Sequence, residues 1–244
     1  MRYLLIALIF FASTAFAYDA KNFNDDVWPY IKERMFGIRP VVELADNHEL
    51  TISGPVRASS GAQVPITITV DTDRFVALHL IIDGNPTQHA ATFKLTKRTQ
   101  TTEISTRIRM ETDSYVRIVG ETVQGQLFAH KTGIRASGGC SGYMDVHDPE
   151  LTLDLGKILY KSKDGYQTTR IKHPMFTGLQ KDLDSQGYIP EWIIKTITWV
   201  DHNGMIVMQA DTEISIAQDP YIKFKYNGNI NIIANDNKGN EFTK

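Results

Sequence analysis

The chain has 244 residues, with 26 Lys or Arg, 28 Asp or Glu and one Cys, and its formal net charge is −2. A composition that is 42% hydrophobic and 22% charged excludes a disordered chain. The balanced charge argues against a dedicated nucleic-acid binder. A single cysteine, Cys140, excludes an intramolecular disulfide framework and any multi-cysteine zinc or iron–sulfur site.

Residues 1–17 have the form of a secretory signal peptide. Arg2 precedes an apolar run over residues 3–11, and small residues follow up to Ala-Phe-Ala at residues 15–17. A membrane anchor would need about 20 apolar residues, and Asp19 follows too soon. We therefore expect export, cleavage and a periplasmic location, with no membrane attachment of the mature protein. In that oxidising compartment an unpaired thiol needs either burial or a use.

The segment 18–40 is predicted to contain a short helix. Asp25 or Asp26 could cap it, Pro29 would lie in its first turn, and Gly37 would end it. Apolar residues recur at i, i+4 and i+8, which gives the helix one apolar face: Val27, Ile31 and Met35.

Residues 41–136 are predicted to form an immunoglobulin-like β-sandwich. Apolar residues alternate with polar ones in several short segments separated by turns that contain glycine. Arg107 and Arg109 lie on one side of such a strand, where they could face solvent or meet an acidic partner. The predicted strands cover residues 64–70, 76–82, 104–110, 116–119 and 126–134.

Residues 151–244 show the same style and are predicted to form a second sandwich. The pair Asn203-Gly204 is a strong hairpin signal between two apolar strands, and Asn227-Gly228 gives another turn. The strands expected here cover residues 194–200, 205–209, 222–226 and 230–232. The predicted fold is therefore all-β, with two immunoglobulin-like sandwiches and a short N-terminal helix.

Residues 137–150 join the two sandwiches and contain the only cysteine. Gly138, Gly139, Ser141 and Gly142 surround Cys140, so the segment is expected to be flexible. We therefore expect an exposed thiol on a hinge between the domains.

A family resemblance gives this thiol a role. Gly138-Gly139-Cys140-Ser141-Gly142 resembles the glycine-flanked cysteine arm that ends SoxY, the sulfur-carrier subunit of the periplasmic Sox system. Other segments resemble motifs of SoxY upstream and of its partner SoxZ downstream, in the order of a SoxY–SoxZ fusion. Such a fusion is similar to the SoxYZ-like carriers associated with quinoprotein dehydrogenases. The matching segments are Val64-Pro65, Asn85-Pro86 and residues 105–109 upstream, and residues 171–178, Ile189-Pro190, Ser215, residues 219–224 and residues 235–239 downstream.

The resemblance implies a carrier that is not an enzyme. Cys140 would hold a covalent sulfur-containing group, sulfane or thiosulfate-derived, without any other cofactor. The partners implied are Sox-type enzymes or a quinoprotein dehydrogenase system, and two chains could pair through Cys140. The sequence departs from the family at two points: the chain continues from Tyr143 into the second domain, and Ser141 stands where the family usually has glycine.

A blue-copper electron carrier is the main alternative. Cys140, Met144 and His147 supply three of the ligand types that such a site uses. A second histidine would be needed, for which His79, His89 and His130 are available. The order of Met144 and His147 and the flexible glycines disfavour a rigid metal site.

Two other candidate sites have simpler explanations. A cysteine hydrolase using Cys140 and His147 would need a rigidly held base and oxyanion hole, which a flexible hinge does not provide. His173 and Met175 are soft metal-ligand types, but Pro174 can fix the entry to a strand with Met175 in the core. For residues 173–175 the structural explanation is favoured over metal binding.

Overall fold

The computed structural model describes residues 23, 25–46, 49–99 and 101–244. The predicted signal peptide, residues 1–17, lies outside the described residues. Within the described part of the chain, no helix has both the length and the apolar character needed to span a membrane.

The predicted helix is present as α1 (Trp28–Phe36), with Pro29 in its first turn. The predicted cap by Asp25 or Asp26 is wrong, because Val27 occupies the cap position and makes no side-chain bond to the helix. Asp25 instead pairs with Arg117 and Lys131 of the neighbouring sheet. At the other end Gly37 adopts a φ of 64°, which ends the helix where predicted.

Helix α1 packs on the outer side of one sheet. Trp28, Ile31 and Phe36 are buried there against apolar residues of three strands. The Arg117 guanidinium lies 4.3 Å from the Trp28 ring centroid and fills the space beneath the helix.

The rest of the described chain is nearly all β. The first half, residues 41–136, contains β1 (Val41–Glu43), β2 (Leu50–Ser53), β3 (Val64–Val70), β4 (Phe75–Ile82), β5 (His89–Leu95), β6 (Thr102–Ile108), β7 (Ser114–Thr122) and β8 (Leu127–Ile134). The segment after it contains β9 (Gly142–Met144) and a 3₁₀ turn over Pro149–Leu151. The second half, residues 151–244, contains β10 (Ile158–Lys163), β11 (Tyr166–Ile171), β12 (Gln180–Asp182), β13 (Ile194–Asp201), β14 (Ile206–Thr212), β15 (Tyr221–Lys225), β16 (Ile230–Asp236) and β17 (Glu241–Thr243).

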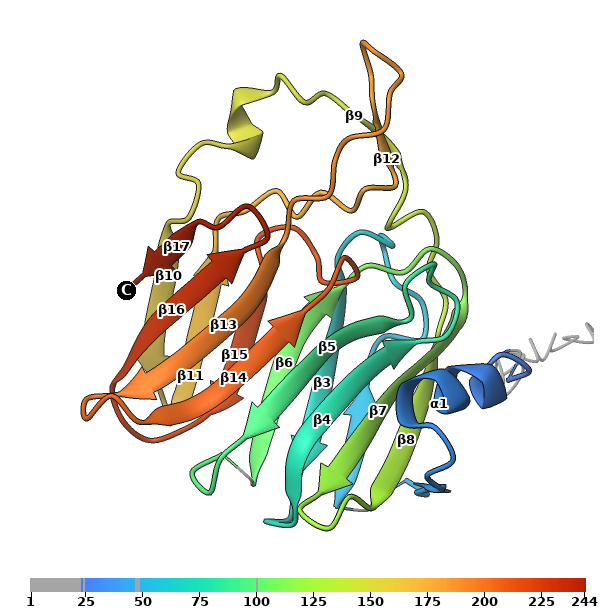
Figure 1. The fold of residues 1–244 in the computed structure, drawn as a ribbon, viewed down its shortest axis with the longest axis vertical. Helices are drawn as coiled ribbons and strands as arrows, with labels where there is room; N and C mark the ends of the chain where they lie inside the picture. Colours follow the sequence, from blue (N-terminus) through green and yellow to red (C-terminus); the bar gives the residue numbers. More distant parts are fainter. Residues whose placement is uncertain (1–22, 24, 47–48, 100) are drawn as a thin grey trace, which may run out of the picture.

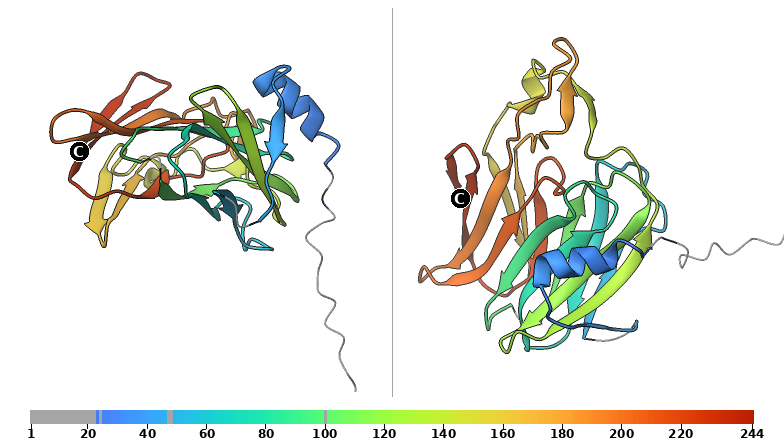
Figure 2. Two further views of the ribbon diagram at one scale, coloured as in Figure 1. Left: turned by 90° about the horizontal axis from the view of Figure 1, so that it is seen from below. Right: turned by 45° about the vertical axis from the view of Figure 1, so that its right-hand side comes forward.

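Two large sheets run through both halves (Figure 1). The nine-stranded sheet has the order β1-β8-β7-β4-β5-β14-β13-β16-β17, and the six-stranded sheet has the order β10-β11-β15-β6-β3-β2. The halves meet where β5 pairs with β14 and β6 pairs with β15, both antiparallel. Figure 2 shows the two layers face to face, with α1 on the nine-stranded one.

This arrangement confirms the all-β, immunoglobulin-like prediction for both halves, but it corrects the expected hinge. The strands β5, β6, β14 and β15 would each present unpaired backbone groups if the halves stood apart. Pairing across the junction satisfies those groups and joins the two sandwiches edge to edge. The core is correspondingly shared, because one buried apolar cluster contains residues of both halves.

A short parallel pair of strands lies beyond one end of the sandwich. Strands β9 and β12 pair with Gly142 opposite Gln180 and Met144 opposite Asp182. Figure 1 shows this pair at the top of the molecule, above both halves. The segment that carries Cys140 runs into it.

Candidate functional site at Cys140

The chain that leads to Cys140 is fixed on the end of strand β6. The Gly138 N–H donates to the Glu111 carbonyl oxygen at 3.0 Å, and the Gly139 N–H donates to the Met110 carbonyl oxygen at 3.0 Å. The Met110 N–H in turn donates to the Gly61 carbonyl oxygen at 2.8 Å. Residues 138 and 139, just before the cysteine, are therefore held by backbone hydrogen bonds to the residues that follow β6.

The glycines here serve close packing and turning. A Cβ atom at Gly139 would overlap the Gly61 carbonyl oxygen and lie 2.7 Å from the Met110 carbonyl oxygen. Gly138 and Gly142 have φ values of +68° and +118°, which side chains disfavour. The expectation of a loose hinge is wrong for this state, because the glycines allow a tight arrangement.

Glu111 holds the cysteine segment from the first half. The N–H groups of Cys140 and Ser141 donate to Glu111 Oε2 at 2.8 Å and 3.2 Å, and Ser141 Oγ donates to Oε1. Partial burial raises the pKa of the Glu111 carboxyl, but these hydrogen bonds outweigh it and keep the pKa below its ordinary value. Glu111 is thus a charged acceptor for three donors.

Thr177 holds the same segment from the second half. Its Oγ1 donates to the Cys140 carbonyl oxygen at 2.7 Å and accepts the Leu179 N–H at 3.1 Å. The next residues, from Gly142, pair with β12 of the second half. Cys140 therefore lies at the point where the chain passes from one half to the other.

The Cys140 side chain is fully buried, which corrects the expectation of an exposed thiol. Burial raises its pKa from 9.0 to about 12; the Glu111 charge adds to the rise and the Arg109 charge opposes it. Because the thiolate is the nucleophilic form, the thiol is protected in this state. The flanking residues Ser141 and Gly142 are exposed.

Arg109 joins the halves directly beneath this site. Its Nη1 donates to the Met175 carbonyl oxygen at 2.6 Å and to those of Ile214 and Ile216 at 3.4 Å. Desolvation lowers its pKa from 12.5 to about 10. Arg109 is only 3% exposed, so its predicted solvent-facing position is wrong, whereas Arg107 is exposed. The strand ends at Ile108, and the alternation of faces ends with it.

Asn85 links Arg109 and Glu111. Its Nδ2 donates to the Arg109 carbonyl oxygen and to Ser215 Oγ, both at 2.8 Å, and its Oδ1 accepts the Glu111 N–H at 2.9 Å. Ser215 Oγ donates back to the Thr87 carbonyl oxygen at 3.0 Å. The residues that carried the family resemblance in both halves thus meet at this junction.

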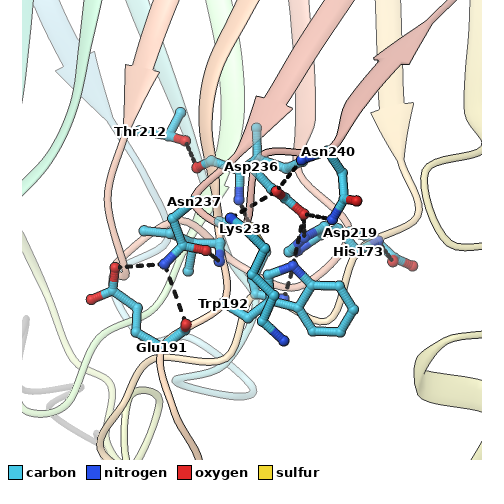
Figure 3. Close-up of polar contacts among 12 residues, drawn as sticks. His173, Glu191, Trp192, Thr212, Asp219, Asp236, Asn237, Lys238 and Asn240 are labelled. Atoms are coloured by element: carbon cyan, nitrogen blue, oxygen red, sulfur yellow. Dashed lines mark hydrogen bonds and ion pairs between the residues drawn. The ribbon is translucent and has the colours of Figure 1, made fainter.

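His173 and Met175 make contacts within the second half, and Figure 3 shows His173 among residues that include Trp192 and Asp236. The Met175 N–H donates to His173 Nδ1 at 3.1 Å, and the Met175 side chain is fully buried, which confirms its predicted core position. His173 Nε2 lies 3.6 Å from Asp236 Oδ2, and the ring packs edge-on to Trp192 at 5.2 Å. Burial lowers the pKa of His173 to about 4, so the ring is neutral at physiological pH.

The residues of the blue-copper alternative are not gathered. His147 is exposed while the Cys140 thiol is buried. His79 contacts Thr92 and Glu121, His89 contacts Thr92, and His130 contacts Asp46 and the Ile52 N–H. Within the described ranges, no three residues drawn from His, Cys, Asp and Glu are placed to hold a metal ion.

Sequence reasoning missed Glu111 and Thr177. Glu111 follows a predicted strand without any motif of its own, so nothing local marks it. Thr177 belongs to the segment 171–178 that resembles SoxZ, but its role depends on a contact 37 residues away in sequence. Only that resemblance could have drawn attention to it.

Comparison with known families identifies the class of protein. The profile of "Sulfur oxidation protein SoxY" matches residues 32–140, and that of "Sulphur oxidation protein SoxZ" matches residues 163–244. The chain therefore belongs to the SoxY and SoxZ families of sulfur oxidation proteins. It is a fusion that carries one domain of each family, and its SoxY match ends at Cys140.

Two solved structures show a weaker likeness. The sulfur carrier protein SoxY from Chlorobium limicola f thiosulfatophilum is 21% identical with a TM-score of 0.40, over 47% of this chain and 100% of that chain. A superoxide reductase (neelaredoxin) from Ignicoccus hospitalis is 9% identical with a TM-score of 0.33, over 37% of this chain and 81% of that chain. A comparison with curated proteins gives no significant match.

Proposed function

We propose that this protein is a periplasmic, non-enzymatic carrier that holds a sulfur-containing group on Cys140. The observation that carries the proposal is the position of the thiol. The only cysteine of the chain stands at the end of the SoxY domain, within a glycine-flanked segment that both halves hold. The partners proposed are Sox-type enzymes or a quinoprotein dehydrogenase system, which load and unload the thiol.

On this proposal, the buried arrangement of Cys140 is the closed state of the carrier. In this state the thiol is buried and its pKa is about 12, so very little thiolate forms near neutral pH. Delivery requires an open state in which Cys140 leaves its pocket and its pKa returns toward the ordinary value. The side-chain contacts from Glu111 and Thr177 must break for this, whereas the two large sheets can stay intact.

The proposed transfer is an exchange at sulfur. The Cys140 thiolate attacks the outer sulfur of a persulfide on a partner protein, a new S–S bond forms, and the partner's S–S bond breaks. The electron pair of the broken bond stays on the partner's sulfur, which leaves as a thiolate and takes up the proton that Cys140 lost. The exchange needs no outside oxidant, and reversing it unloads the carrier.

Intact-mass measurement of protein purified without reductant tests the proposal. We expect mass additions that map to Cys140, disappear on treatment with dithiothreitol and are absent from Cys140→Ser. A disulfide-linked dimer would be a separate species at twice the mass. A homogeneous, unmodified mass after exposure to a persulfide donor, in a protein whose thiol is shown to open by alkylation, would contradict a carrier role.

A further inference from the structure

The outer side of the six-stranded sheet carries a dense set of cations. These cations lie on neighbouring strands in cross-strand pairs. In the β10–β11 pair, Leu159 is opposite Arg170, Lys161 is opposite Thr168, and Lys163 is opposite Tyr166. Strand β15 continues these pairs with Tyr221, Lys223 and Lys225 opposite the β11 residues. We call this surface the cationic face and define it by Arg107, Lys161, Lys163, Arg170, Lys223 and Lys225.

Most of this charge is not neutralised by neighbouring acids. Among the residues that the structure describes, Arg107, Lys161, Lys223 and Lys225 form no ion pair with a carboxylate. Arg170 shares Asp219 with Lys172, and Lys163 lies 3.7 Å from Asp164. Because the whole chain has a net charge of −2, this positive surface is a local feature.

Tyrosines lie between the cations. The Arg107 guanidinium is 5.2 Å from the Tyr221 ring centroid, and Lys223 Nζ is 3.9 Å from the Tyr166 ring centroid. Two neighbouring hollows of about 250 Å³ and 470 Å³ open among these side chains. Tyrosine and arginine together are typical of surfaces that bind proteins.

The cationic face spans the junction of the two halves and reaches toward the thiol. Arg107 comes from β6 of the SoxY domain, and the other five residues come from β10, β11 and β15 of the second half. Arg107 is two residues before Arg109 and four before Glu111, which holds Cys140. A partner bound here would contact both halves, with Arg107 at the end of the face that is nearer Cys140 and Lys163 beside the β10–β11 turn at the other end.

We propose that the cationic face docks an acidic surface of the partner protein that acts on Cys140. The proposal rests on the carrier function above and names the chemistry of its partner. A membrane surface fits less well, because Leu159 is the only large aliphatic side chain among the cross-strand pairs of the cationic face and shallow insertion needs several. Nucleic acid fits less well because the chain as a whole is acidic.

The test measures binding of a fluorescent oligoglutamate peptide by anisotropy. The face variant is Lys161→Glu with Lys223→Glu, and the matched control is Lys97→Glu with Lys244→Glu, exposed lysines outside the face. Both variants change the net charge equally. We expect the face variant to lose about tenfold or more in affinity and the control to stay within about twofold. Binding should also weaken as ionic strength rises from about 0.01 to 0.15 M.

Three outcomes would overturn the proposal. Equal losses in both variants would show that only net charge matters. Binding to phosphatidylglycerol vesicles or to heparin without binding to the peptide would assign the face to a membrane or a polyanion. Absence of all binding would show that the face docks no acidic surface. Because the assay works equally with Cys140→Ser, its failure is distinct from failure of the carrier function, which the mass measurement reports.

Discussion

Glu111→Gln should open the Cys140 site without disrupting the sandwich. The carboxylate accepts two N–H groups and one hydroxyl, whereas the amide keeps one acceptor oxygen and adds a donor beside them. Hydrogen bonds to charged groups contribute about 1.5–3 kcal/mol and neutral ones about 0.5–1.5 kcal/mol. Since Glu111 is only half-buried, we expect the closed state to lose about 1–2 kcal/mol.

The assay is the rate of Cys140 alkylation by N-ethylmaleimide under native conditions. When opening is fast and unfavourable, this rate is proportional to the open population. A loss of about 1–2 kcal/mol therefore corresponds to about a 5- to 30-fold faster reaction. The matched control is Glu103→Gln, because Glu103 lies at the other end of strand β6, where it pairs with Thr69 of β3.

The pH dependence of Cys140 alkylation is an independent test of the same site. Burial, with the Glu111 charge, raises the pKa of Cys140 from 9.0 to about 12, so the closed state is fully stable below pH 9 and loses stability as pH rises toward 12. Wild-type alkylation should keep accelerating above pH 9, where a free thiol levels off. Equal rates for Glu111→Gln, Glu103→Gln and wild type, or a wild-type rate equal to that of unfolded chain, would refute the reasoning.

Four further predictions concern the packing of the two halves and of this site. Arg109→Met leaves buried carbonyl groups without a donor and should lower the free energy of unfolding, measured by urea titration, by about 2–4 kcal/mol. Because the two large sheets run through both halves, wild type should unfold in one calorimetric transition. Two separate transitions would contradict this. Gly139→Ala forces a Cβ atom against two carbonyl oxygens and should raise the rate of Cys140 alkylation. In Gly138→Ala the new Cβ atom meets no other atom within 4 Å. That variant should lose only about 1–2 kcal/mol of folding free energy, because of its φ of +68°. Burial lowers the pKa of His173 from 6.5 to about 4, so only the unfolded chain takes up a proton on this residue between these pH values. The free energy of unfolding should therefore fall by about 3 kcal/mol from pH 6.5 to pH 4. If His173→Asn showed the same change in unfolding free energy with pH, this prediction would be contradicted.

Alternating patterns predicted many of the strands because those strands have one face in the core. Strand β3 matches its predicted range, and its buried residues alternate along it. The hairpin at Asn203-Gly204 was predictable from turn chemistry, and it joins β13 to β14 as expected. Such signals are local, and both the period and the turn are contained in a few residues.

The junction of the halves was not predictable in the same way. Strand β5, which joins the halves in the larger sheet, has two adjacent buried residues, Ala90 and Ala91, so the period of two is interrupted. Arg109 looked like a surface residue because the pattern gives no sign that β6 ends at Ile108. Long-range pairing decides both cases.

The Cys140 site depends on both domains of the fusion. Glu111 of the SoxY domain binds the backbone N–H groups of the segment, and Thr177 of the SoxZ domain binds the Cys140 carbonyl oxygen. Arg109, which lies between them, has its guanidinium donors directed to carbonyl groups of the SoxZ domain. The SoxY domain alone would lack both the Thr177 contact and the carbonyl acceptors that the Arg109 guanidinium uses. The pairing of β5 with β14 and of β6 with β15 holds the halves together independently of the contacts on residues 138–142, so the proposed opening of the thiol does not require the halves to separate.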